Sequence, residues 1–389
     1  MAGSVGSMNA REKWEHFVQV DALPHRTEQI RNLYKYFCEH KDLIAQEFVL
    51  IFDQFCQNLR RIQDAGEMQK CACIHISLLR TSMIEGQPVY MLEAFDIETL
   101  DRVKLSPFRY HAYWIFSFMN KLEDLCDADR RKYAGQIDRP MLEAWMKEQV
   151  FPFHEFMVHA VRYAMDRVVR LASFRSIEKE VLFEIRVCEY RDQNESESVY
   201  RINESKKMSV SCKGWLECLF DHDYIYEHIQ DVDVSYGQYA GINLNYARLE
   251  NVGLTQSNMR NSYLLGSKFE ACRCDLVDFS GSTLFDADFR NCNLEQARFD
   301  HVLAQRNLMN EKRGMIFGIH GVNFQGANLT NASFRGARLA GDFLNAALNG
   351  TDFTDADLTG SYMLKRDADR VLLSGDQRQS ISWVEGNAS

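Results

Sequence analysis

The sequence contains few prolines, and all five lie before residue 153. A proline has no backbone N–H to donate, so its absence from the second half suits a structure in which most amides pair with neighbouring strands. Long apolar runs are also absent, and none approaches the roughly 18 residues that a membrane-spanning helix needs. No signal-peptide pattern precedes the first expected helix. We therefore expect no membrane span, and a second half held together by backbone pairing.

Motifs that carry out chemistry are missing as well. The sequence has no P-loop, no glycine fingerprint for a dinucleotide, no zinc-protease motif and no Gly-x-Ser-x-Gly elbow. Cys71, Cys73 and His75 resemble metal ligands, but on a helix only Cys71 and His75 share a face, and no second ligand pair follows. Glu155 and His159 lie one helical turn apart, but a di-iron bundle needs Glu-x-x-His pairs on two helices. We expect no catalytic residue, no metal and no cofactor, and hence no enzyme.

The charge balance opposes one class of partner. With 45 basic and 55 acidic residues, the formal net charge is −10 and the isoelectric point is near 5.6. Nucleic acids are bound by basic surfaces, so we expect no direct nucleic-acid partner. The 11 cysteines form no evenly spaced framework. We interpret them as reduced thiols in a cytoplasmic protein.

A five-residue repeat runs from about Val234 to Met363. Each unit has an apolar centre, usually with a small residue two places before it. Of 22 centres, 20 are Leu, Phe or Met, and the exceptions are Cys274 and Ala304. Two inward side chains separated by one outward residue are typical of a short strand, which leaves two residues for a turn. Glycine, which favours turns, fills the second turn position at Gly266, Gly281, Gly326, Gly336, Gly350 and Gly360.

This segment resembles the pentapeptide-repeat family, whose motif is small–Asp/Asn–Leu/Phe–polar–variable. The resemblance implies a right-handed quadrilateral β-helix with four repeats, or about 20 residues, in each coil, stacked at the strand spacing of a sheet. We expect its core to include ten of the centres: Leu249, Phe269, Phe279, Phe289, Phe299, Phe324, Leu329, Phe334, Leu339 and Phe353.

A coil of this length predicts columns of residues 20 apart in the sequence. One apolar column would read Met259, Phe279, Phe299, Ile319 and Leu339. A second would read Leu249, Phe269, Phe289, Met309 and Leu329. A third fails at its fourth place, and it reads Leu254, Cys274, Leu294, Gly314 and Phe334.

The rest of the chain divides around the repeat, which makes the fold class α+β and multidomain. Three- and four-residue apolar spacing predicts an N-terminal α-helical bundle. In chain order we expect a tag remnant at 1–9, the helical domain at 10–180, a strand hairpin and linker at 181–212, a cap helix at 213–230, the β-helix at 231–364 and a C-terminal cap or tail at 365–389. A cap is expected because a solenoid end exposes strand edges and core.

Two places break the repeat. From 305 to 321 the inward positions hold Asn307, Lys312 and Phe317, so the chain either leaves the rod as a loop or forms one distorted coil. A four-residue step from Leu339 to Phe343 should kink one corner. In resistance proteins that the segment resembles, loops that interrupt the rod are needed to act on a topoisomerase. The resemblance thus nominates these partner-binding residues: Arg306, Lys312, Arg313, Met315 and Phe317.

Outward positions carry Asp or Asn often, as at Asp278, Asp288, Asn293, Asn323, Asn328, Asp342, Asp352 and Asp357, and such a ladder could mimic duplex DNA. The net charge over 231–370 is only −3, with 17 acidic and 14 basic residues, which restrains that idea.

Three functions stay open. The first is a non-catalytic bacterial binding protein whose rod contacts a type II topoisomerase such as DNA gyrase, in antibiotic resistance or regulation, with a homodimer through a rod end as an option. The second is a scaffold or effector whose helical domain recognises a protein partner. The third is a small-molecule sensor or an unrecognised enzyme in the helical domain.

Overall fold

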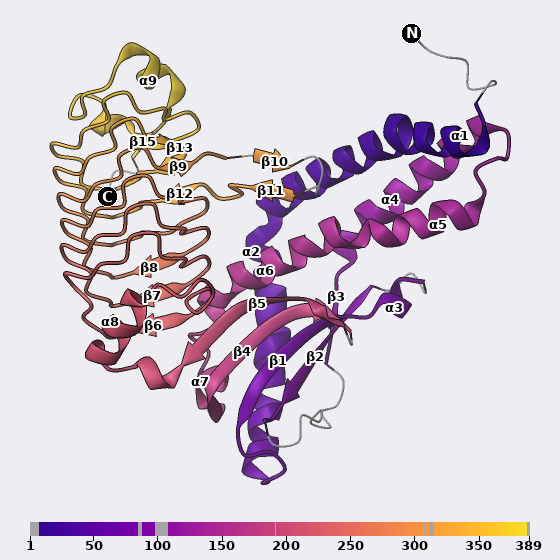
Figure 1. The fold of residues 1–389 in the computed structure, drawn as a ribbon, viewed down its shortest axis with the longest axis horizontal. Coiled ribbons are helices and arrows are strands. Elements are labelled where there is room, and N and C mark those ends of the chain that lie inside the picture. The colour runs from indigo at the N-terminus through magenta and orange to yellow at the C-terminus, as the bar shows by residue number, and fades with distance from the viewer. Residues whose placement is uncertain are drawn as a thin grey trace. The chain divides into compact units, whose positions relative to one another are not determined.

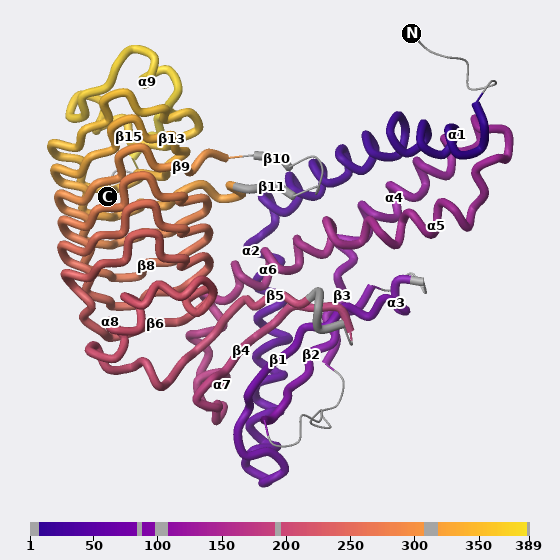
Figure 2. Tube along the Cα trace, viewed as in Figure 1, coloured from indigo at the N-terminus to yellow at the C-terminus, as the bar shows by residue number. Residues whose placement is uncertain are grey.

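The computed structural model describes residues 8–84, 88–97, 108–190, 192–306, 308–310 and 315–386. The chain divides into two compact units, the first comprising most residues up to Val199 and the second most residues from Tyr200 onward. Among the described helices, none is long and apolar enough to cross a membrane. Each unit is described by itself below (Figures 1 and 2).

The N-terminal unit combines helices with a sheet. Its long helix α2 packs against α4 and α6 and also contacts strands β2 and β3. Fully buried rings of Phe37, Phe48, Phe52 and Phe55 fill the apolar stripe of α2, so this dense aromatic content forms core. The helices are α1 (Ala10–Phe17), the π-helix η2 (Val18–Ala22), α2 (Leu23–Asp64), α3 (Arg80–Ile84), α4 (Tyr113–Arg130), the 3-10 helix η3 (Arg131–Tyr133), α5 (Arg139–Glu148), α6 (Val150–Val168) and α7 (Ala172–Ser176).

Five strands form one sheet in the order β3-β2-β1-β4-β5 (Figure 1). They are β1 (Cys71–Leu78), β2 (Val89–Phe95), β3 (Phe108–His111), β4 (Lys179–Glu189) and β5 (Asp192–Asn203). β2 runs antiparallel to both β1 and β3. The amide of Cys71 donates to Glu178 O and the amide of Tyr190 donates to Leu78 O, so β1 runs parallel to β4. The sheet is therefore mixed, and its central pairing joins segments more than a hundred residues apart.

The helical prediction for the N-terminal region is confirmed, but the prediction of a pure bundle was wrong. Cys71–Leu78, interpreted as helix, is a strand whose partner is distant in the sequence. Pro152 interrupts no helix in this region. The chain breaks at Gln149, between α5 and α6, which places Pro152 in the first turn of α6, where a missing N–H is tolerated.

The second unit is a stack of coils that pair in parallel. Its N-terminal helix α8 (Ser209–Glu217) is shorter and earlier than the expected cap helix, and pairing between coils already begins with β6 (His228–Gln230). β6, β7 (Arg248–Glu250) and β8 (Lys268–Glu270) pair residue by residue at a spacing of 20. The remaining elements of this unit are η4 (Glu204–Lys206), β9 (Leu303–Ala304), β12 (Val322–Asn323), β13 (Arg338–Leu339), β14 (Gly341–Asp342), β15 (Tyr362–Leu364), η5 (Lys365–Asp367), α9 (Gly375–Ser380) and β16 (Ser382–Val384). Two further strands, β10 (Leu308–Asn310) and β11 (Met315–Phe317), follow β9 in the chain, and most of their residues are assigned to the first unit.

Most corners of the coils are made by the same backbone conformation. The second residue after the apolar centre has a positive φ at every fifth residue from Asp231 (55°) to His301 (57°), and the pattern resumes at Gly321 (69°) but is absent at Gly341, after the four-residue step. This left-handed region disfavours most side chains and favours Gly and Asn. The frequent Gly and Asn at the second turn position are therefore explained by the corner itself.

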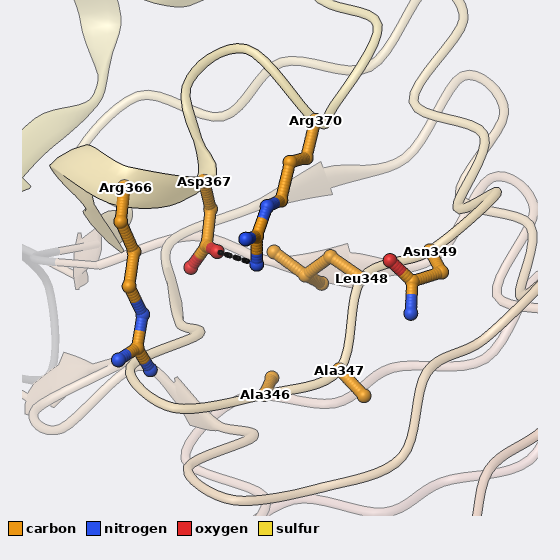
Figure 3. A pocket seen from close by; sticks show the side chains of 7 residues that line it. All are labelled: Ala346, Ala347, Leu348, Asn349, Arg366, Asp367 and Arg370. Carbon is orange, nitrogen blue, oxygen red and sulfur yellow. Dashed lines mark ion pairs between the residues drawn. The ribbon is translucent and has the colours of Figure 1, made fainter.

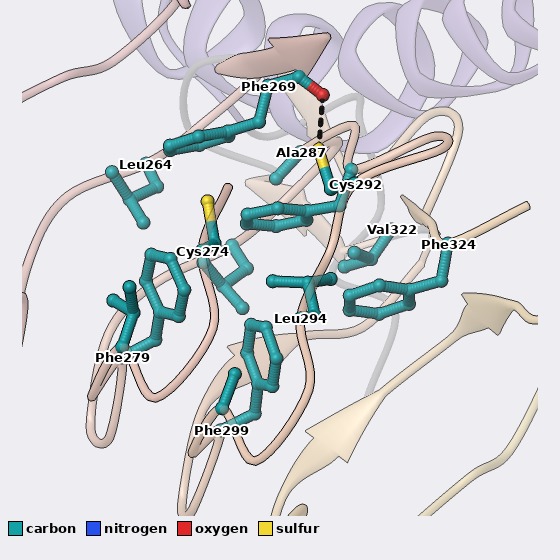
Figure 4. Close-up of a cluster of buried hydrophobic side chains, with 14 of the residues drawn as sticks. Leu264, Phe269, Cys274, Phe279, Ala287, Cys292, Leu294, Phe299, Val322 and Phe324 are labelled. Carbon is teal, nitrogen blue, oxygen red and sulfur yellow. Dashed lines mark hydrogen bonds between the residues drawn. The ribbon is translucent and has the colours of Figure 1, made fainter. Parts of the chain in front are cut away.

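Two columns of phenylalanine run through the coils (Figure 4). Phe269, Phe289, Phe324 and Phe343 stack at centroid distances of 4.6, 5.4 and 5.2 Å. Phe279, Phe299, Phe334 and Phe353 stack at 5.0, 4.8 and 5.1 Å. Rings of one column meet the edges of the other, as Phe289 and Phe299 do at 5.7 Å. All ten core residues expected from the sequence are at most 1% exposed.

The expected columns are right up to Phe289 and Phe299 and wrong beyond them. Asp288 pairs with Asn323 and Arg298 pairs with Ser333, a spacing of 35 where 20 was assumed. Hence Phe324, not Met309, follows Phe289, and Phe334, not Ile319, follows Phe299. The surplus of three five-residue units leaves the path of the coil, which decides between the two alternatives in favour of an inserted segment.

The four-residue step after Leu339 is accommodated within a single shorter coil. Asn328 pairs with Ala347 and Ser333 with Asp352, a spacing one position shorter than that of an ordinary coil. Asp342 then pairs with Tyr362, which restores the ordinary spacing. Phe324 and Phe343 still stack with ring planes 10° apart across this coil, so the columns stay aligned.

Candidate partner-binding site

The insertion, defined here as residues 305–321, interrupts one corner of the rod. It follows β9 and precedes β12, and its two strands β10 and β11 form a two-stranded sheet (Figure 1). The strands that flank it stay in parallel pairing with the coils, β9 with β13 and β12 with β14. The insertion therefore enters and leaves the rod at neighbouring points without disturbing the coils on either side.

Asp286 holds the returning end of the insertion. Its carboxylate accepts hydrogen bonds from three successive amides, those of Ile319 (3.0 Å), His320 (2.5 Å) and Gly321 (3.0 Å). Burial raises the pKa of Asp286, and the three amide bonds and the nearby Arg306 guanidinium oppose that rise. Hydrogen bonds to a charged group are stronger than neutral ones, although the desolvation of the buried carboxylate offsets part of their contribution to stability. The carboxylate thus fixes the backbone where the chain rejoins the rod.

Arg306 holds the departing end. Its Nη2 donates to the carbonyl oxygen of His320 at 2.6 Å, and its guanidinium lies 5.2 Å from the centre of the Tyr362 ring. The buried Nε of Arg306 has no acceptor among the described residues. Arg306 was predicted to contact a partner, but its head group is engaged within the rod, between the two ends of the insertion.

Two glycines let these ends approach. Gly318 and Gly321 have φ values of 70° and 69°. A Cβ at Gly318 would lie 2.1 Å from Gln305 O, and one at Gly321 would lie 2.4 Å from Ala340 O. Both clashes are with backbone, so neither position accepts a larger residue without movement of the chain. We call Asp286, Arg306, Gly318, His320 and Gly321 the root of the insertion.

Two of the other predicted contact residues lie in the second strand of the insertion. Met315 and Phe317 are the first and last residues of β11. Lys312 and Arg313 lie outside the described residues. Asp286 is not among the residues predicted from the sequence. It occupies an ordinary corner position where Asp, Asn and Gly are common, so nothing in its own sequence context marks it.

The acidic ladder has a structural role. All eight outward Asp and Asn residues singled out above accept a hydrogen bond from the amide two residues later, as Asp278 does from Ser280 at 2.9 Å and Asp352 from Thr354 at 2.9 Å. Such bonds stabilise turns. Arginines also neutralise several of the carboxylates, as Arg260 does for Asp278 at 3.1 Å. The face is therefore less anionic than its sequence suggested.

The N-terminal unit contains a separate buried polar pair. The Tyr90 hydroxyl and His154 Nδ1 are 2.8 Å apart, and both side chains are buried. Burial lowers the pKa of His154 to about 4, and it raises the pKa of the neighbouring Glu155, with the Glu197 carboxylate adding to the rise. No group of three or more His, Cys, Asp or Glu side chains within the described residues is arranged to hold a metal ion.

Comparison with known proteins bears on the rod alone. A family model described as pentapeptide repeats (8 copies) matches residues 262–300 and 320–341. The gap between the two matched segments, residues 301–319, covers almost the whole insertion and differs from it by a few residues at each end. No curated protein matches the chain.

Several solved structures are similar to part of this chain. Full-length QnrB1, a plasmid-mediated fluoroquinolone resistance protein, is 17% identical over 42% of this chain and 88% of that chain, with a TM-score of 0.27. HetL, a pentapeptide repeat protein involved in heterocyst differentiation regulation from the cyanobacterium Nostoc, is 19% identical over 37% of this chain and 76% of that chain, with a TM-score of 0.21. A pentapeptide repeat protein from the Arabidopsis thaliana thylakoid lumen is 21% identical over 41% and 81%, with a TM-score of 0.17. Scores this low support no statement about function.

The five-residue spacing, the coils and the family match agree on one point: the C-terminal region of this chain, over residues 262–341, is built of pentapeptide repeats.

Proposed function

We propose that the chain is a non-catalytic binding protein whose repeat rod presents the insertion to a protein partner. The observation that carries this proposal is the root, in which one carboxylate accepts from three successive amides and one guanidinium bridges to the returning strand. These contacts fix both ends of the insertion on the rod. Preorganised loops lose less conformational entropy on binding, which favours affinity.

The coils support the geometry that the family resemblance implies. A pairing distance of 20 along the sequence, with a corner at every fifth position, fits four sides per coil. We infer that the rod is a right-handed quadrilateral β-helix, which provides flat outer faces and a rigid base for the insertion.

A bacterial type II topoisomerase, DNA gyrase, is the partner to test first, with resistance or regulation as the role and the cytoplasm as the location. In the resistance branch of the family, loops that interrupt the rod are needed to act on the topoisomerase, and this rod has such an interruption. Mimicry of duplex DNA by the rod faces is a weaker basis, because the outward carboxylates are bonded in turns and paired with arginines.

Removal of the insertion tests the proposal directly. Deletion of residues 306–320 would return the coil to its ordinary length and would leave Gly321, whose φ is already positive, at the vacant corner. Asp286→Asn in the same variant removes the orphaned carboxylate and keeps a residue that tolerates this corner. We expect the full chain to alter gyrase supercoiling or quinolone inhibition at low micromolar concentration, and the loopless variant to have no effect.

The loopless variant should unfold at the same temperature as the full chain, which serves as the control for folding. A full chain without any effect on gyrase at micromolar excess would exclude that enzyme as the partner. A pull-down that captures the same proteins with the full chain and with the loopless variant would exclude the insertion as the binding element.

A groove in the N-terminal unit favours a second candidate, recognition of a protein partner by the helical domain of a scaffold or effector. Its volume is about 500 Å³, and it lies between α1, η2 and α5. Its lining combines the apolar Trp14, Val18, Met141, Ala144 and Trp145 with Glu15, Gln19 and Glu148. A Val18→Glu variant that loses capture of the partner, while the loopless variant retains it, would favour this candidate. Capture of a small metabolite in the same groove would favour a sensor.

A further inference from the structure

The last coil of the rod leaves one of its sides uncovered. β15 and β16 cover the neighbouring side, where the amide of Ser382 donates to Ser361 O at 2.8 Å. The Gln377 side chain covers the next sides by donating to Phe353 O and Ala356 O at 2.7 and 2.9 Å. Over Ala346–Leu348 the chain lays no further strand, because η5 turns away at Asp367, the position one ordinary coil length after Ala347.

This uncovered side presents a free peptide edge. In an inner coil, Leu294 N donates to Asn328 O and Asn328 N donates to Cys292 O, so each strand pairs with the next coil. The equivalent groups of the last coil are the Leu348 N–H and the Ala346 carbonyl oxygen. Neither has a hydrogen-bond partner within the described part of the chain. An extended segment could pair with this edge, as peptides do at exposed sheet edges.

Charged side chains lie beside this edge, and together with the edge they line a pocket of about 310 Å³ (Figure 3). Arg366, Asp367 and Arg370 lie along one side, and Ala346, Ala347, Leu348 and Asn349 line the other. The two arginines outweigh the single carboxylate, so the pocket has a formal charge of +1 and attracts an anion. Arg366 also donates to Asn345 Oδ1 at 3.2 Å, which holds its guanidinium near the edge.

Asp367 supplies the second, independent observation. Its side chain is 10% exposed, and its Oδ1 pairs only distantly with Arg370, at 3.8 Å. Its other oxygen, Oδ2, is buried and accepts no hydrogen bond from the described residues. In Figure 3 that oxygen points away from Arg370, toward the side on which Arg366 lies. A buried carboxylate oxygen without a donor costs free energy, so a ligand that supplies an N–H is favoured here.

We propose that this pocket binds the carboxyl terminus of a peptide. The terminal carboxylate lies between the Arg366 and Arg370 guanidiniums, which match it in charge and geometry. A peptide carbonyl accepts from Leu348 N–H, and peptide N–H groups donate to Ala346 O and Asp367 Oδ2. The ligand thus continues the rod for one strand, with the arginines specifying that the strand ends there.

Calorimetric titration of the full chain tests the proposal with three probes: N-acetyl-trialanine with a free carboxylate, its C-terminal amide, and free alanine. We expect the free acid to bind and both other probes to bind at least about tenfold more weakly, because one loses the charge-assisted bonds and the other loses the edge pairing. Arg370→Gln and Arg366→Gln should each weaken binding of the acid by about tenfold.

Arg335→Gln is the matched control, since Arg335 is an exposed arginine of an earlier coil whose partner is Asp352. It should leave peptide binding unchanged, and all three variants should unfold at the temperature of the unmodified chain. Equal affinity for the acid and the amide, equal affinity for free alanine, no saturable binding of the acid, or an equal loss in Arg335→Gln would each overturn the proposal.

Discussion

The two units of this chain both bury apolar cores, but their cores differ in connectivity. In the rod, Phe299 stacks on Phe279 of the coil before it and on Phe334 of the coil after it. In the N-terminal unit, β1 pairs with β4 across more than a hundred residues. A core built from regularly spaced contacts repeats in the sequence, whereas a core built from distant pairing leaves no period to find. Because each unit has its own core, a core substitution in one unit should lower the free energy of unfolding of that unit and leave that of the other unchanged.

The largest effect is expected from Phe299→Ala. Phe299 is fully buried and touches rings of both phenylalanine columns, so truncation should lower the free energy of unfolding of the rod by about 3–5 kcal/mol. Denaturant unfolding followed by hydrogen exchange should show the loss in residues 228–384 alone. Phe37→Ala is the matched change in α2. Equal destabilisation of both units by either variant would contradict their independence.

Asp286→Ala should have the next largest effect, about 2–3 kcal/mol, because it removes the acceptor of three amide hydrogen bonds. Hydrogen exchange at Ile319, His320 and Gly321 should accelerate, with the phenylalanine columns unchanged. Asp286→Asn keeps one acceptor oxygen and should retain part of the protection. Unchanged exchange at these three amides would show that the root does not hold the insertion.

A smaller effect concerns pH in the N-terminal unit. The pKa of His154 falls from 6.5 to about 4 on folding, so the unfolded chain binds more protons and stability is lost as pH drops through this window. The raised pKa of Glu155 acts in the opposite direction above pH 4.5, because the folded state then binds the extra proton. Glu155→Gln should therefore steepen the loss between pH 6.5 and 4.5 by at most about 1.4 kcal/mol per pH unit.

Thermal or denaturant unfolding of the variant at several pH values measures that slope. His154→Gln is the complementary change and should flatten the loss over the same range. A slope that is identical in all three proteins would show that neither side chain changes its protonation on folding.

The smallest effect is expected from Arg273→Gln. Arg273 pairs with Asp233 at 3.3 Å on the rod surface, with side chains 64% and 58% exposed. Such pairs contribute roughly 0–1 kcal/mol, so the midpoint of unfolding should hardly move. A loss comparable with that of Asp286→Ala would mean that surface charge, and not the buried columns, holds the coils together.

The sequence was sufficient for the rod because its chemistry repeats. Inward Phe and Leu at every fifth place specify both the coils and the positions of the corners, so the ten expected core residues could be named in advance. Cys71–Leu78 could not be assigned in the same way. Its alternating Ile74, Ile76 and Leu78 suit a strand, but the segments that pair with it are distant in sequence and carry no matching period.

The site was predicted in part for a related reason. A break in the repeat marks where the insertion lies, yet only the structure pairs Asp286 with amides at the far end of that insertion. The side chain of Arg306, expected to meet a partner, turns back to His320 because the nearest acceptor lies on the returning chain.

Phase and stacking are separable properties of this rod, as its two irregular coils demonstrate. The lengthened coil gains a whole number of five-residue units, so the count in fives continues without a slip while every later column shifts to a new partner. The shortened coil does the reverse, since it breaks the count but leaves Phe324 over Phe343. An insertion whose length is a multiple of five could thus be gained or lost at a corner without changing the five-residue count. A deletion of a single residue would change that count visibly, yet it would leave the stacking of the core side chains almost unchanged.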